Sequence, residues 1–335
     1  MENQKLHKVS DTQQGLLKSY ALAVLIMSLL INMLSAYIRH IEAGLGCENW
    51  PACYAQIGDF VSPTDGIDIT QRALAPTESA KRIHRTMATI LVVVALLLVN
   101  QSRKPGAIQG ANNMLPYLLL AVLLLLSIIG PASYLKTMPV IALINLTGGI
   151  ALLAISGLLW LQLQCRSTNN SPAPLWIKRL VFSGLFLLLC QILLGAWVSA
   201  NFAGLACNEL LSCKPDPEYS AQGNNSFWYF RELTLNNQGR VIFDSSAVHI
   251  HLTHRLGAVI SALVLLAGAF LARPYQSKAA LSVVFLVILQ VMAGIAGILW
   301  SLPIVIVLSH NLLATLLLLA SLTLYYQLIP REVNS

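Results

Sequence analysis

Two histidines stand near the starts of two strongly apolar runs, His254 in the stretch His251–Arg255 and His310 in the stretch Leu308–Asn311. One further apolar run separates them, so both enter the membrane from the same side, and at about 1.5 Å per residue both imidazoles reach a similar depth. An ionisable side chain at that depth is costly without a partner. Two imidazoles at one level between facing helices can supply both axial ligands of a haem iron. They can also form a hydrogen-bonded pair that packs two helices together.

The stretch around His254 has an earlier counterpart in Arg82–Arg85, which contains His84 and also opens an apolar run. His84 is therefore a third candidate ligand for haem iron. The position that matches His310 is Asn145, and asparagine is a poor haem ligand. An iron held by His84 would keep its other axial position open to water or oxygen.

Arginines directly follow two of these histidines, as Arg85 and Arg255. An arginine at this depth can extend its guanidinium to the membrane surface. It can also pair with a carboxylate through two hydrogen bonds, and haem propionates near the outer surface would supply one. His251 shares a helix face with His254. It can orient a ligand, bind a propionate or meet water.

The composition places these residues in a membrane. Apolar residues make up 56% of the chain and charged residues 10%, whereas soluble domains carry about 25% charged residues. A membrane-spanning helix needs about 20 mostly apolar residues, and eight runs have this character. They are Ser19–Ile38, Arg82–Asn100, Leu115–Leu135, Pro139–Leu163, Ile177–Val198, Val248–Leu271, Ala279–Trp300 and Pro303–Tyr326.

The basic residues predict the orientation of these spans. The formal net charge is +7, but the lysines and arginines gather in the tails and short loops of one side, while Lys136 is the single basic residue in the two short turns of the other. This is the pattern of the positive-inside rule. It predicts that both termini are cytoplasmic, and it argues against nucleic-acid binding.

The two long loops predicted on the outer side carry the same cysteine pattern. Cys47 and Cys53 have the same spacing as Cys207 and Cys213, and an Ala-Gly-Leu step precedes each pair. In an oxidising compartment such as the bacterial periplasm each pair can close a small disulfide loop. Free thiols and metal ligands are the alternatives.

This repetition predicts the architecture. The cysteine loops are offset by 160 residues, and His84 and His254 by 170, so the chain contains two versions of one four-helix unit. Four spans return the chain to its starting side, which makes the repeat parallel. We expect an all-α integral membrane protein with eight transmembrane helices in two tandem four-helix bundles. The predicted parts are a tail (1–18), an N-terminal unit (19–165) and a C-terminal unit (166–335).

Taken together, these features resemble the haem A synthase family of membrane cytochrome-oxidase assembly proteins. The resemblance rests on the two four-helix halves, the first cysteine loop with Gly-Leu-Gly-Cys47 and Trp50-Pro51, the His-Arg pairs, and the histidine near the start of the last span. It extends from Ser19 to Tyr326. It implies that haem O is oxidised at a methyl group, through hydroxylation, to the formyl group of haem A for cytochrome oxidase biogenesis.

The resemblance also implies roles for individual residues. It assigns a haem b cofactor to His254 and His310 in the second half, for electron transfer, and substrate haem O to the first half near a catalytic His84. Arg85 and Arg255 are then expected beside the porphyrin propionates. The cysteines of the first outer loop match those that the family places above the substrate site. The expected disulfides are Cys47–Cys53 and Cys207–Cys213.

Two positions depart from the family pattern. Family members usually carry a histidine where this chain has Asn145, and many carry a glutamate where it has Lys81. These departures leave an alternative function open, that of a non-catalytic haem b-binding or electron-transfer membrane protein with the same fold.

The expected environment follows from the spans and the resemblance. The chain is expected in the bacterial inner membrane as a multi-pass protein, with the cysteine loops on the outer face. Expected partners are haem O, haem A and the lipid bilayer, together with haem O synthase and cytochrome oxidase assembly factors.

Overall fold

The computed structural model describes residues 2–42, 76–104, 114–130, 138–164, 173–207, 209–210, 226–233 and 245–329. These parts of the chain are predominantly helical and contain no β-strand, which confirms the predicted all-α class. The helices are α1 (Glu2–Glu42), α3 (Pro76–Ser102), α4 (Met114–Ile129), α5 (Pro139–Gln164), α6 (Leu175–Ala200), the short 3₁₀-helix η2 (Ala203–Leu205), α7 (Ser245–Ala272), α8 (Ser277–Leu299) and α9 (Ile304–Leu328).

Seven of these helices are long and apolar enough to cross a membrane, with mean hydropathies between 1.9 and 2.5. The chain is therefore a multi-pass membrane protein. The spanning segments are Gln13–Ile41, Ser79–Ser102, Pro139–Gln164, Leu175–Ala200, Ser245–Ala272, Ser277–Leu299 and Ile304–Leu328.

The third predicted span is shorter than expected. The sequence predicted Leu115–Leu135, whereas α4 has 16 residues and ends at Ile129. Gly130 and Pro131 follow in the sequence, and a residue before proline disfavours the helical conformation, which explains why α4 ends there. Because residues 131–137 lie outside the described part of the chain, an eighth span stays a prediction.

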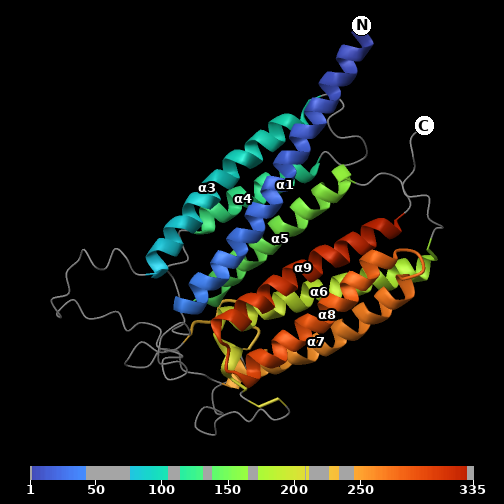
Figure 1. Ribbon diagram of the computed structural model, residues 1–335. Coiled ribbons are helices and arrows are strands. Elements are labelled where there is room, and N and C mark those ends of the chain that lie inside the picture. Colours follow the sequence, from blue (N-terminus) through green and yellow to red (C-terminus); the bar gives the residue numbers. More distant parts are fainter. Residues whose placement is uncertain are drawn as a thin grey trace, which may run out of the picture.

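Helices α1, α3, α4 and α5 pack around one apolar core (Figure 1). Each contributes a fully buried leucine to it, namely Leu17, Leu91, Leu119 and Leu159. Long apolar side chains on facing helices fill the space between them at close-packed density. These four helices therefore form one packed group.

Helices α6, α7, α8 and α9 form a second group with its own core. Leu185, Ala269, Val283 and Leu318, one from each helix, lie buried in it. Figure 1 shows the two groups side by side, with the start of α1 and the end of α9 toward the same end of the molecule.

Small residues bring the two groups together. Helix α5 lies beside α9 (Figure 1), and Gly157 of α5 faces Leu319 of α9 so closely that a Cβ at Gly157 would collide with it. Within the first group, Asn32 of α1 donates its Nδ2–H to the backbone O of Gly149 in α5 at 3.0 Å. Small residues at helix contacts are the usual means of close approach in membranes.

Candidate functional site

The turn between α8 and α9 determines where His310 lies. Ser301 and Leu302 both adopt positive φ angles of 56° and 60°, and the Leu302 N–H donates to Gly297 O at 2.7 Å. Pro303 then precedes the first turn of α9 with φ −58°, a conformation suited to a helix start. His310 consequently enters about two turns below this end of the helix group.

His254 of α7 is held by the neighbouring helix α6. Gln191 of α6 places its Nε2 2.9 Å from Nδ1 of His254 and 2.9 Å from the backbone O of the same residue. One helical turn farther along α6, a Cβ at Gly195 would lie 3.0 Å from Cε1 of His254. The imidazole therefore packs directly on the backbone of α6.

His310 of α9 is held in the same manner by α8. Gln290 places its Nε2 3.1 Å from Nε2 of His310, and a Cβ at Gly294 would lie 3.4 Å from Cε1 of His310. The other ring nitrogen, Nδ1, is buried and has no hydrogen-bond partner among the residues that the structure describes.

His254 of α7 and His310 of α9 both lie near the starts of their helices in the second helix group. Each ring uses one nitrogen toward a glutamine, and in the described part of the chain no hydrogen bond reaches Nε2 of His254 or Nδ1 of His310. Each imidazole thus keeps one ring nitrogen without a hydrogen-bond partner among the described residues, and two such rings could both coordinate a haem iron.

Arg255 directly follows His254, and its guanidinium donates hydrogen bonds to backbone oxygens. Its Nη1 donates to Glu209 O at 2.7 Å and to Leu210 O at 3.3 Å, and its Nη2 donates to Cys207 O at 2.6 Å. The arginine thus ties the start of α7 to the loop after η2. Pairing of Arg255 with a propionate stays a prediction.

The cysteine predictions fall mostly outside the described residues, which exclude Cys47, Cys53 and Cys213. Cys207 is buried and is disulfide-bonded. Its predicted pairing with Cys213, like that of Cys47 with Cys53, stays a prediction.

His251 lies one turn before Arg255 and is only 5% exposed, so it does not meet bulk water. Its ring lies near the backbone of Ala203 in η2, and Nδ1 is buried without a partner in the described chain. Since Cys207 lies just after η2, His251 and Arg255 both lie against the segment formed by η2 and the residues that follow it.

The first helix group positions its candidate residues differently. His84 is partly buried on α3 and Arg85, its neighbour, is exposed; Asn145 is partly buried on α5. Within the described ranges no hydrogen bond joins His84 to Asn145. The structure therefore places His254 and His310 in the second helix group and His84 in the first, and a shared site of His254 and His310 stays a prediction.

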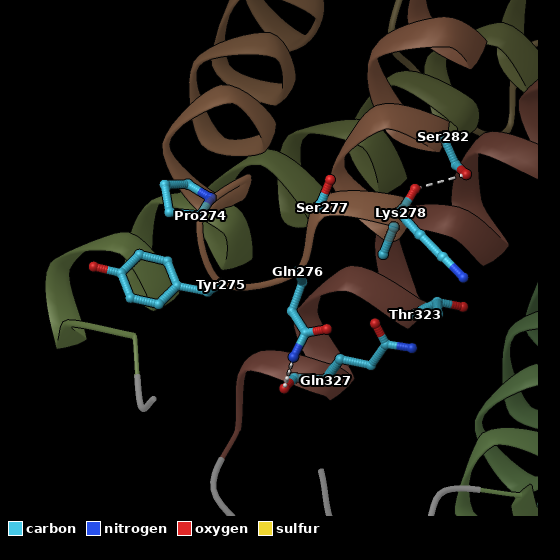
Figure 2. A pocket seen from close by; sticks show the side chains of 9 residues that line it. Pro274, Tyr275, Gln276, Ser277, Lys278, Ser282, Thr323 and Gln327 are labelled. Atoms are coloured by element: carbon cyan, nitrogen blue, oxygen red, sulfur yellow. Dashed lines mark hydrogen bonds between the residues drawn. The ribbon is translucent and has the colours of Figure 1, made fainter. Parts of the chain in front are cut away.

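A cavity of about 590 Å³ lies at the other end of the second group (Figure 2). It is lined by the turn between α7 and α8 and by the end of α9. There Gln276 donates its Nε2–H to Gln327 O at 3.2 Å, and Lys278 lies nearby. Because the histidines stand near the beginnings of α7 and α9, this cavity is distinct from their site.

Residues 18–322 match the family described as cytochrome oxidase assembly protein. This chain belongs to that family. The membership confirms the resemblance seen in the sequence. One relative of this cytochrome oxidase assembly protein, a heme A synthase from Shewanella oneidensis, is 32% identical over 314 residues, which cover 90% of this chain and 93% of the relative.

Sequence reasoning missed the two glutamines of this cytochrome oxidase assembly protein. A signal was present, because Gln191 and Gly195 have the same four-residue spacing as Gln290 and Gly294. That spacing puts each glutamine and its glycine on one helix face. Each pair stands on the helix that precedes a histidine-bearing helix.

Proposed function

We propose that this protein is a haem A synthase, which oxidises a methyl group of haem O to the formyl group of haem A. The structural observation that carries the proposal is the pair His254 and His310, two partly buried imidazoles near the starts of two helices of one four-helix group. Family membership supports it, as does a relative named heme A synthase that matches nine-tenths of the chain.

Under this proposal His254 and His310 hold a haem b in the second helix group. Haem bound there supplies reversible one-electron transfer. The protein orients the ligands by packing each ring against a glycine, Gly195 or Gly294, and by hydrogen-bonding it to a glutamine.

Haem O is the proposed substrate of the first helix group, with His84 as the residue that contacts it. Arg85 follows His84 on an exposed part of α3, where its guanidinium can bind a propionate. Asn145 is only a weak donor, so His84 would hold the substrate from one side. Coordination of the iron by one residue would hold the porphyrin more weakly than coordination by two, so the product could leave more readily.

The two groups are proposed to be copies of one unit. Their helices form two separately packed cores, and the matching stretches around His84 and His254 support a parallel repeat with units 19–165 and 166–335 after the tail 1–18. Both termini are proposed to face the cytoplasm of a bacterial cell. The disulfides Cys47–Cys53 and Cys207–Cys213 would then lie on the outer face, and haem O synthase and other cytochrome oxidase assembly factors are the proposed protein partners.

The test is the haem content of membranes from cells that make haem O but no haem A. We expect extraction and chromatography to show haem A when this chain is produced, and none when it carries His84→Ala. A purified protein that binds haem b yet leaves haem O unchanged, with a reductant present, would contradict the enzyme. That result would favour the electron-transfer alternative that Asn145 and Lys81 suggest.

A further inference from the structure

Two glutamines approach the two histidines in matching ways. Gln191 sets its amide nitrogen 2.9 Å from His254 Nδ1, and Gln290 sets its own 3.1 Å from His310 Nε2. In both amides the carbonyl Oε1 is buried and has no hydrogen-bond partner in the described chain. Buried carbonyl oxygens are nearly always paired in native proteins, so each site contains an acceptor without a donor.

The hydrogen bonds of Gln191 define where His254 carries its proton. The amide nitrogen also donates to His254 O at 2.9 Å, and an amide nitrogen can only donate. Nδ1 of His254 must therefore accept, which places the ring proton on Nε2. That tautomer blocks the nitrogen that a metal would otherwise bind, because a ligating neutral imidazole carries its proton on the other nitrogen.

A half turn of the amide would reverse this assignment. It exchanges Nε2 with Oε1 of Gln191 and gives up the hydrogen bond to His254 O. The carbonyl then accepts a hydrogen bond from Nδ1–H, and Nε2 of His254 keeps its lone pair. Space for the turned amide is provided by Gly257 of α7, where a Cβ would overlap Oε1. Because Gly257 has no side chain, it leaves room for the Gln191 amide to rotate.

We propose that Gln191 and Gln290 are positioning residues for the haem ligands, and that each turns its amide carbonyl toward the imidazole N–H of its histidine when haem is bound. The inference rests on the proposed haem site at His254 and His310. A hydrogen-bond acceptor for the N–H of the nitrogen that does not bind the metal makes the imidazole a stronger electron-pair donor to the iron. A stronger donor stabilises ferric over ferrous iron and lowers the midpoint potential of the haem.

The experiment measures the midpoint potential of haem b in the purified full-length protein, followed by the visible spectrum. Gln191→Leu and Gln290→Leu remove the acceptor at similar volume, and both are expected to raise the potential. Up to a tenfold change in the ratio of oxidised to reduced haem at fixed ambient potential is expected, which corresponds to about 59 mV for one electron. Gln191→Glu, which retains an oxygen at the same reach, is expected to keep the potential at or below that of the wild type.

Gln276→Leu is the matched control. Gln276 also donates to a buried backbone oxygen, but at the opposite end of the group, so its loss should leave the potential unchanged. Leucine variants that retain haem at the wild-type potential would overturn the inference. If they lose haem, Gln191→Glu and the shorter Gln191→Asn decide: retention by glutamate alone supports the acceptor role, and loss by both contradicts it.

The wild-type spectrum separates this inference from the proposed function. A wild-type protein with bis-histidine low-spin haem establishes the site, whatever the glutamine variants do. A wild type without such a spectrum would overturn the proposed haem site, and this inference with it, before any variant is compared.

Discussion

The two helix groups use their polar residues for different purposes. In the second group Gln191 approaches the imidazole of His254. The 160-residue offset of the cysteine loops places Ile31 at the corresponding position of α1, and Ile31 packs against the apolar core. Its neighbour Asn32 bonds the backbone of α5 instead. In the second group two glutamine amides contact imidazoles, whereas in the first group Asn32 joins two helices through a backbone oxygen.

Under the proposed function, this difference explains how one fold could hold a permanent cofactor and a substrate that must leave. Two ligands, each oriented by a hydrogen bond and a glycine, would favour permanent binding of haem b. His84, which no amide contacts through a hydrogen bond in the described chain, would favour exchange of the substrate. Retention is then controlled by the number and orientation of ligands rather than by the helices themselves.

The largest expected effect comes from removing a ligand in each group. We expect His310→Ala to abolish the bis-histidine spectrum of haem b, because haem iron with a single histidine ligand is no longer held low-spin. We expect His84→Ala to leave that spectrum intact and to abolish haem A formation. Spectroscopy of the purified proteins, with pigment analysis of membranes, checks both. Loss of the haem b spectrum in His84→Ala would show that the groups do not act separately.

Asn145→His tests the same comparison by making the first group resemble the second. A second imidazole opposite His84 would complete the axial ligands, so the purified protein should retain more porphyrin, rising from about one toward two per chain by the ligand count of a bis-histidine site. Haem extraction with protein quantification measures this. An unchanged haem content, in a variant that still binds haem b, would show that His84 and residue 145 do not face a common ligand.

The helices of this site could be predicted from the sequence, since about 20 apolar residues define a span and the expected run Val248–Leu271 lies inside α7. The depths of His254 and His310 followed from counting turns. Helix α4 shows the limit of that approach. It ends at Ile129, before a Gly-Pro step, although the apolar run continues beyond that step.

The partners of the site residues could not be predicted. Gln191 lies 63 residues from His254, and only helix packing determines that the two meet. Arg255 donates to three backbone oxygens. Every residue type has a backbone oxygen, so no sequence motif identifies these acceptors. A hydrogen bond between two side chains restricts the residue types at both positions, whereas a hydrogen bond to a backbone oxygen restricts only the donor.

The two glycines beneath the imidazoles should differ in their tolerance of a methyl group. A Cβ at Gly195 would lie 3.0 Å from the His254 ring, against 3.4 Å for Gly294 and His310. Gly195→Ala should destabilise the protein by about 1–3 kcal/mol through overpacking. Gly294→Ala should be near neutral, because alanine gains about 0.5–1 kcal/mol in a helix interior. Unfolding of the haem-bound protein in mixed micelles compares them, and equal losses would contradict the difference in packing.

The smallest expected effect concerns Asn32 in the first group. Asn32→Ala removes the hydrogen bond from α1 to Gly149 O, and interhelical hydrogen bonds in membranes contribute about 0.6 kcal/mol on average. We expect a loss of that size in the free energy of unfolding and no change in the haem b spectrum. Ser127→Ala is the control, because Ser127 bonds only Leu123 O within α4 and its loss should separate no helices. If Asn32→Ala shifted the haem b spectrum, the amides of the first group would also support the cofactor, and the contrast between the two groups would fail.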